Sequence, residues 1–169
     1  MAEIIRFSLT YDLAEDRIAW DMVDQEGETT RLWLTQRLCR ALAQAVFPMV
    51  TAEGAAADTP APVQETLQAW EQEAAMANFG SIPAVQPKPS SRTGLVGKVH
   101  LTPNGESLNF TFEFGEGEQR VIGVGRAELR QTLAMIYRLH VAASWPTDVW
   151  PIWITEGETT VETTPAARH

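Results

Sequence analysis

Three kinds of residue in this chain could take part in chemistry: histidine, cysteine and closely spaced glycines. His140 lies on the apolar stripe of a predicted helix without a second histidine or a carboxylate at metal-ligand spacing, which favours a core histidine. Cys39 lies beside the apolar face of another predicted helix, which favours a small buried hydrophobe over a nucleophile. Gly123-Val124-Gly125 lacks the third glycine of a dinucleotide-binding loop, so it indicates a turn and a helix cap.

Sequence motifs of the common enzyme classes are missing from the chain. It has no paired-cysteine or HExxH metal signature, no GxxxxGK[ST] phosphate loop and no GxSxG nucleophile elbow. Its acidic residues gather in predicted hairpin turns without the spacing or central glycine of a calcium loop, which indicates solvated turn residues. We therefore expect a protein without catalytic residues, metal or cofactor.

Composition and charge narrow the setting of this protein. The chain has 169 residues, a formal net charge of −9 and a single cysteine. A lone cysteine cannot form an internal disulfide, and the N-terminus lacks the pattern of a signal peptide, so we expect a cytoplasmic protein. No apolar run approaches the roughly 20 residues that a membrane span needs. Net negative charge repels phosphate backbones on average, although its distribution over the surface is a separate matter.

The first part of the chain, residues 4–50, predicts three strands and then a helix. Apolar and polar side chains alternate from Ile5 to Tyr11 and from Ile18 to Met22, which is the two-residue period of half-buried strands. A third strand is predicted at 29–34, and Thr35 suits the N-cap of the helix that follows. The helical spacing beyond it involves Leu38, Leu42, Ala45, Val46 and Met49.

Residues 94–144 repeat that order of elements. A strand carrying Leu95, Val99 and Leu101 leads into an Asn-Gly hairpin turn, two more strands and a helix. A shift of 90 residues superposes apolar positions of the two parts. These pairs are Leu9 with Val99, Ile18 with Leu108, Trp20 with Phe110, Met22 with Phe112, Leu32 with Ile122, and Leu34 with Val124. We predict an α+β fold of duplicated β-β-β-α units, a pseudo-twofold single domain with helices on one side of an antiparallel sheet. Chance similarity of two periodic segments is the alternative.

An insert at 51–93 separates the two predicted repeats. Its first part is rich in Ala, Thr and Pro and predicts a linker, whereas residues 63–78 predict a helix between Pro62 and Gly80. One side of that helix is apolar, and we expect another element to cover it. That side consists of Val63, Leu67, Trp70 and Ala74.

The segment 145–154 is rich in tryptophan and is interrupted by Pro146 and Pro151, which predicts an extended backbone. Residues 155–169 are polar and predict a disordered tail. Aromatic anchors on a stiff backbone suit the groove of a partner, because little conformational entropy is lost on docking. Closing the core of its own subunit is the alternative role. The predicted partner-binding residues are Trp145, Val149, Trp150, Ile152 and Trp153.

A second candidate surface is the strand face that points away from the predicted helices. It is net positive on a negative protein, and cations beside an aromatic ring suit single-stranded nucleic acid, where phosphates pair with the cations and bases stack on the ring. Cross-strand pairing with Asp21 and Glu113, with Trp33 covered by another segment, is the alternative. The candidate residues are Arg6, Arg17, Arg31, Trp33, Lys98 and His100.

The sequence therefore predicts a non-enzymatic protein-interaction or assembly adaptor that acts through the tryptophan-rich segment. Its partner would be another protein or a second copy of the chain, as in a homo-oligomer. The alternative is a single-stranded nucleic-acid-binding module that uses the strand face around Arg31 and Trp33.

Overall fold

The computed structural model of the chain describes residues 3–52, 58–80 and 83–159, with side chains described as far as residue 156, and has one six-stranded sheet and four helices in those residues. The strands are β1 (Ile4–Asp12), β2 (Arg17–Asp24), β3 (Thr29–Leu34), β4 (Arg92–Asn104), β5 (Ser107–Phe114) and β6 (Glu118–Gly125). The helices are α1 (Gln36–Thr51), α2 (Ala61–Ala77), α3 (Arg126–Ala142) and α4 (Ile152–Thr159). The fold is therefore α+β, as predicted.

Each half of the sheet is an antiparallel meander followed by a helix. In the first half, Trp20 lies opposite Leu9 on one side and Leu32 on the other. The Thr35 Oγ1 accepts a hydrogen bond of 3.3 Å from the Leu38 N–H at the start of α1, which is the predicted N-cap. The second half has the same local order, with β4, β5 and β6 in sequence before α3.

The two halves join through a parallel pair, because β3 and β4 run in the same direction with Leu32 opposite Gly94. A Cβ atom on Gly94 would lie 2.6 Å from Cδ2 of Phe114, so glycine is needed where these elements approach. The strand order is β1-β2-β3-β4-β5-β6, and the sheet is mixed rather than antiparallel as predicted. A twofold axis between the halves would pair β1 with β6 as well, yet these strands stand at opposite ends of the order. The predicted pseudo-twofold duplication is not confirmed.

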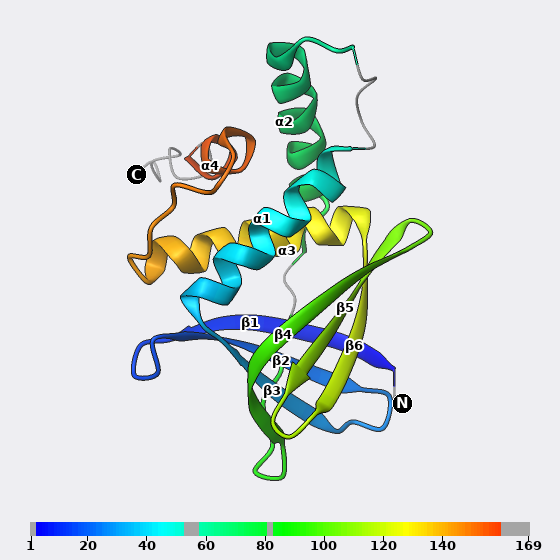
Figure 1. Cartoon of the computed structure of the whole chain (residues 1–169), viewed down its shortest axis with the longest axis vertical. Coiled ribbons are helices and arrows are strands. Elements are labelled where there is room, and N and C mark those ends of the chain that lie inside the picture. The colour runs from blue at the N-terminus through cyan, green and yellow to red at the C-terminus, as the bar shows by residue number, and fades with distance from the viewer. Residues whose placement is uncertain (1–2, 53–57, 81–82, 160–169) are drawn as a thin grey trace, which may run out of the picture.

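The core lies inside a strongly curved sheet. The ring of Trp20 on β2 lies 5.1 Å from Phe112 and 5.9 Å from Phe110, both on β5. Strands three places apart would be about 14 Å apart in a flat sheet, so the two halves must curl toward each other to bring these rings into contact. Figure 1 shows α1 and α3 lying across the curved sheet, with α2 and α4 farther out.

Two β-bulges change which residues face that core. The register shifts between Ile4 and Arg6 in β1 and between Val96 and Lys98 in β4. An extra residue in one strand turns the following side chains to the other face. Ile5, predicted to face the core, is consequently 62% exposed, and Ile4 packs against the core in its place. The same correction applies to Leu95, which is exposed while Val96 is buried.

The chain leaves α3 through a tight turn that directs the tryptophan-rich segment back onto the protein. Ser144 has a φ of 56°, in the left-handed region. Its N–H donates to the carbonyl of Val141 at 3.0 Å, and the N–H of Trp145 donates to the carbonyl of His140 at 2.9 Å. These two bonds form a Schellman cap, which satisfies carbonyls at the end of α3 and fixes the direction of the exit.

The prediction that residues 145–154 are entirely extended is wrong at the end of the segment, where α4 begins at Ile152. Pro151 immediately precedes the helix, a position where the missing N–H of proline has no helical partner to lose. The predicted disordered tail, 155–169, begins inside α4. Residues 160–169 and residues 53–57 of the predicted linker lie outside the described residues.

Candidate functional site

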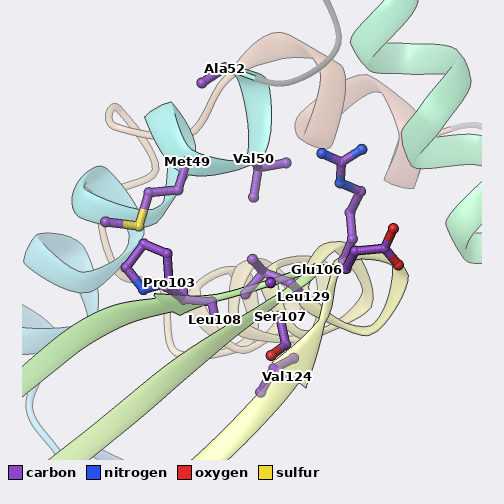
Figure 2. Close-up of a pocket in the computed structure, with 11 residues that line it drawn as sticks. Met49, Val50, Ala52, Pro103, Glu106, Ser107, Leu108, Val124 and Leu129 are labelled. Carbon is purple, nitrogen blue, oxygen red and sulfur yellow. The ribbon is translucent and has the colours of Figure 1, made fainter.

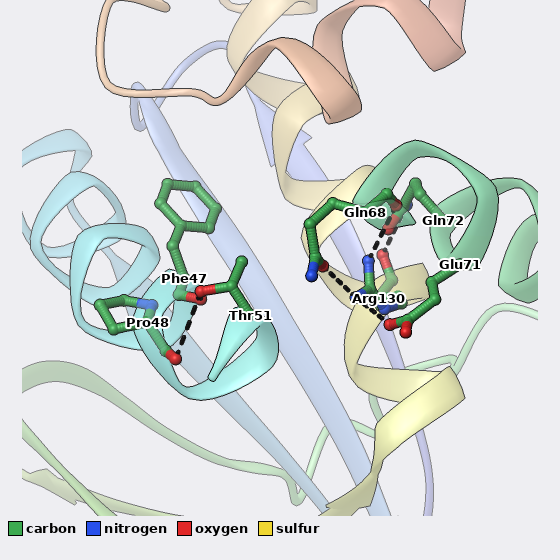
Figure 3. Close-up of polar contacts among 7 residues, drawn as sticks. All are labelled: Phe47, Pro48, Thr51, Gln68, Glu71, Gln72 and Arg130. Atoms are coloured by element: carbon green, nitrogen blue, oxygen red, sulfur yellow. Dashed lines mark hydrogen bonds and ion pairs between the residues drawn. The ribbon is translucent and has the colours of Figure 1, made fainter. Parts of the chain in front are cut away.

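Helix α2 packs on the protein through a polar side. Gln68 and Gln72 are buried, and Ala75 lies three residues further on the same face. This face contacts α3 and α4. At its centre stands Arg130 of α3, which is only 2% exposed (Figure 3). Contacts with polar side chains therefore fix which side of α2 faces the protein.

The guanidinium of Arg130 links three helices. Its Nη2 donates to Oε1 of Gln68 and, at 2.6 Å, to Oε2 of Glu71, while Nε2 of Gln72 donates to the main-chain oxygen of Arg130 at 3.2 Å. The guanidinium also lies 5.1 Å from the ring of Trp153 on α4. Burial lowers the pKa of Arg130, and the nearby carboxylate of Glu71 opposes that shift, so the ion pair compensates part of the cost of burying the charge.

The opposite side of α2 is apolar and faces outward. Trp70 is 64% exposed and Val63 is 48% exposed, while Leu67 is half-buried and Ala74 is exposed. The sequence predicted that another element would cover this side. Among the described residues, no element covers Trp70 or Val63. The physical reason is that the buried glutamines must reach hydrogen-bond partners on α3, which turns the apolar residues away. We call Val63, Leu67, Trp70, Ala74 and Ala77 the α2 stripe.

The tryptophan-rich segment shows the reverse arrangement, because its three indoles are buried against their own chain. The Nε1 of Trp145 donates to Oδ1 of Asp16 at 3.0 Å. Trp150 and Trp153 meet the ring of Phe47 at 5.4 and 6.2 Å in edge-on geometry. Figure 3 shows Phe47 on the last turns of α1. These contacts match the alternative interpretation of the segment, closure of its own core.

The remaining residues of the predicted partner-binding set are less enclosed. Val149 is half-buried, and Ile152 is exposed. Between the buried indoles, Asp148 forms a bidentate ion pair with Arg40 of α1 at 2.6 and 3.0 Å. The arginine holds the pKa of Asp148 below its usual value. This ion pair attaches the segment to α1 at the surface of the protein, and the indoles attach it through the core.

His140 is a fully buried residue of this aromatic cluster. Its ring lies 5.1 Å from that of Trp145 and 5.2 Å from that of Trp150. Nδ1 lies 2.9 Å from the carbonyl of Ile136, while Nε2 is buried without a hydrogen-bond partner among the described residues. Burial lowers the pKa of His140. It is a core histidine, as predicted. Cys39 is buried as well, and burial raises the pKa of its thiol to about 12.

Most charges on the predicted nucleic-acid face are paired within the protein. Arg31 binds Asp21 with two bonds of 2.7 and 2.8 Å and lies 5.2 Å from the ring of half-buried Trp33. Nε2 of His100 lies 2.8 Å from Oε1 of Glu113. Arg17 pairs with Glu15. The two remaining cations of the predicted nucleic-acid face, Arg6 and Lys98, have exposed side chains.

The chain between α2 and β4 covers part of the same face. The N–H of Val85 donates to Oγ of Ser8 at 2.9 Å, and the N–H of Lys88 donates to Oγ1 of Thr29 at 3.1 Å. Val85 is buried there, as is Ala19, which alternation along β2 had placed on the open face. The face is therefore narrower than the sequence pattern predicted.

A pocket of about 200 Å³ opens between the end of α1 and the β4–β5 hairpin (Figure 2). Its lining is mainly apolar, with Val50, Leu108 and Leu129 among the contributing residues, and Glu106 and Ser107 supply polar atoms. The Ser107 hydroxyl donates to the carbonyl of Asn104 at 2.8 Å. The lining contains no histidine or cysteine that could serve as a base or nucleophile.

Comparison with models of known protein families found no match, and comparisons with curated proteins and with solved structures found none either. Among the described residues, no group of three or more histidines, cysteines or carboxylates is arranged to hold a metal ion. No helix in the described part of the chain has the length and apolar character needed to cross a bilayer.

Sequence reasoning did not single out Arg130, the residue that orients α2. Arg130 follows Leu129 directly and precedes Leu133, so it stands at the edge of the apolar stripe of α3. The i, i+4 pair Gln68 and Gln72 was the complementary signal on α2. Neither signal identifies the other, because residues about 60 positions apart become neighbours only in the fold.

Proposed function

We propose that this protein is a non-enzymatic interaction module that binds a protein partner through the α2 stripe. The observation that carries the proposal is that Trp70, 64% exposed, stands on the outward side of a helix whose inward side is anchored by polar contacts. Exposed apolar side chains that line up along one element mark interaction surfaces, and tryptophan is enriched at their energetic centres. The tryptophan-rich segment supports this role indirectly, by packing α4 beside α2.

A crosslinking experiment tests this proposal. A photo-reactive phenylalanine analogue is placed at position 70 of the full chain and, as a matched control, at Leu13, which is 83% exposed in the β1–β2 turn. We expect a discrete protein adduct from position 70 and none from position 13. With the reactive residue at Val63, Trp70→Glu should abolish the adduct without changing the circular dichroism spectrum. Equal adducts from both control and test positions, or none from position 70, would contradict the proposal.

Binding of single-stranded nucleic acid by the outer strand face is the alternative function. The observation in its favour is the stacking of the Arg31 guanidinium over Trp33, a pair that could receive a base. The ion pair between Arg31 and Asp21 argues against it, because the carboxylate competes with phosphate. Titration with an oligonucleotide at low salt distinguishes the two functions: binding lost in Trp33→Ala but retained in Trp70→Ala would favour this alternative.

We also infer that the two halves of the sheet are repeats of one unit. Each of the six residue pairs related by a shift of 90 shares the same degree of burial, half-buried for Leu9 and Val99 and buried for the other five. A bulge in the first strand of each half adds to the similarity. An experimental structure in which the halves did not superpose with these pairs equivalent would overturn this inference.

A further inference from the structure

The α2 stripe has the spacing of a helix-pairing seam. Its residues stand at 63, 67, 70, 74 and 77, alternating steps of four and three residues. This is the a/d spacing of a coiled coil, in which each apolar residue inserts between four residues of a facing helix. A second helix is therefore the structure that fits this seam.

The size of the side chains along the stripe defines the surface that a partner must match. Trp70 is the largest residue, while Ala74 and Ala77 beyond it leave the backbone of α2 accessible. A complementary helix places bulky aliphatic residues over the two alanines and smaller ones opposite the indole.

Charges beside the seam define the partner further. In the same register, Glu71 and Glu73 occupy e and g positions, one on each side of the stripe. Glu73 is exposed, and the side chain of Glu71 is 40% exposed although it pairs with Arg130. Helix α2 contains no lysine or arginine, and the whole chain has a net charge of −9. Lysine or arginine at the flanking positions of a partner helix would be attracted mainly to the Glu73 edge of the seam, because Arg130 already compensates the charge of Glu71.

A second copy of the chain fits the shape of the stripe but not its charge. Antiparallel pairing centred on Gln72 would place Trp70 over Ala74 and Leu67 over Ala77, large against small. The same pairing brings each exposed Glu73 toward its counterpart, and like charges across a helix interface are destabilising. An anionic membrane meets the same obstacle, since helices that lie on membranes carry lysine and arginine on their polar faces.

We infer that the occupant of the α2 stripe is a basic amphipathic helix of another protein. This inference rests on the proposed function and adds the chemistry of the partner: a helical segment with an apolar a/d seam and lysine or arginine beside it. Arg130 of α3 contacts both α2 and α4, and these contacts hold the seam in place before the partner arrives. Less entropy is therefore lost on binding.

Three synthetic helical peptides of about 20 residues test the inference. They share one leucine-rich seam and differ only at the flanking positions, which carry lysine, glutamine or glutamate. Each is labelled with a fluorophore and titrated with the full chain at about 50 mM salt, following anisotropy. We expect the lysine peptide to bind at least about fivefold more tightly than the glutamine peptide, with the difference reduced at high salt. The glutamate peptide should bind most weakly.

Matched variants of α2 make the result specific. Glu73→Gln should reduce the difference in affinity between the lysine and glutamine peptides, because it removes one flanking charge. Glu65→Gln is the control, since Glu65 is an exposed carboxylate on the same helix at an f position away from the seam, and it should leave the difference unchanged. Trp70→Ala should weaken binding of every peptide.

The possible outcomes separate this inference from the function on which it rests. Equal binding of all three peptides, lost in Trp70→Ala, would overturn the basic partner and leave the interaction surface intact. Absence of peptide binding together with a dimer that Trp70→Glu converts to a monomer would show that the occupant is a second copy. Absence of both peptide binding and dimerisation would overturn the inference and count against the proposed function.

Discussion

Helix α2 and the tryptophan-rich segment from Trp145 to Ile154 both contact α3, yet they present opposite sides to the protein. The segment turns three indoles inward against aromatic residues of α1 and α3. Helix α2 turns its glutamines inward and leaves Trp70 outside. The difference lies in what α3 offers to each. Its C-terminal part presents Tyr137 and His140, whereas its N-terminal part presents the buried guanidinium of Arg130, which packs on the ring of Trp153 and directs its N–H donors to polar side chains of α2.

The apolar side of an amphipathic helix therefore need not be its buried side. A buried arginine with unsatisfied donors costs more than exposing a few apolar side chains, because an unpaired buried charge loses its hydration without compensation. Exposed valine and tryptophan side chains cost only the area they leave in water. The polar network therefore determines the orientation of α2, and the exposed stripe follows from it.

Replacing the buried Trp150 and the exposed Trp70 with alanine should give the largest difference in stability. Trp150→Ala should lower the free energy of unfolding by about 3–5 kcal/mol, because it removes a buried ring and leaves a cavity among Phe47, Tyr137 and His140. Trp70→Ala, the matched control, should change it by no more than about 0.5 kcal/mol. Chemical denaturation measures both. Similar losses in the two variants would mean that the stripe is also buried in the free protein.

A smaller effect is expected from the polar anchor of α2. Arg130→Met should lower the free energy of unfolding by about 2 kcal/mol, because Gln68 then loses a buried hydrogen-bond donor. In this variant, amide hydrogens of α2 should exchange with solvent faster than those of α1. Adding Gln68→Leu to Arg130→Met should restore part of the stability by removing the unsatisfied carbonyl. Arg37→Met, an exposed position on α1, serves as the control. Unchanged exchange in α2 after Arg130→Met would show that other contacts hold the helix.

The smallest effect concerns pH and the aromatic cluster. Burial lowers the pKa of His140, and the charge of Arg40 lowers it further, so below a pH of about 6.5 the unfolded chain binds a proton that the folded chain does not. Stability should then fall with decreasing pH, by at most about 1.4 kcal/mol per pH unit, down to the pKa of the folded state. Above that range His140 contributes no pH dependence.

Denaturation curves of the wild type and of His140→Gln between neutral and mildly acidic pH measure this slope. The variant should be less stable at neutral pH and should lose the slope. His100→Gln is the comparison variant, because His100 lies on β4 outside the aromatic cluster and pairs there with Glu113. The lowered pKa of Glu113 and of Asp16 adds a loss only at lower pH, where carboxylates titrate. A slope that survived in His140→Gln but vanished in His100→Gln would contradict the assignment.

Sequence periodicity predicted most elements of the fold, because alternation and helical spacing are local consequences of burying one face. It failed at three places where a nonlocal contact intervenes. The bulges at Ile5 and Gly97 reverse the facing only of the residues at the start of β1 and β4, and the parallel pairing of β3 with β4 depends on the close approach at Gly94. The helix after Pro151 was missed because proline was taken to exclude helix on both sides, although it is tolerated at a helix start.

Local sequence patterns were enough to predict the order of the elements from β1 to α3, the Thr35 cap, the hairpin turn at Gly105 and the apolar character of the α2 stripe. These depend on interactions between residues close in the chain, whose geometry is nearly the same in any fold. The burial of Trp150 and the exposure of Trp70, in contrast, depend on tertiary contacts. What separates the two tryptophans is the part of α3 that each segment meets: aromatic side chains, or a buried guanidinium whose N–H donors need hydrogen-bond acceptors.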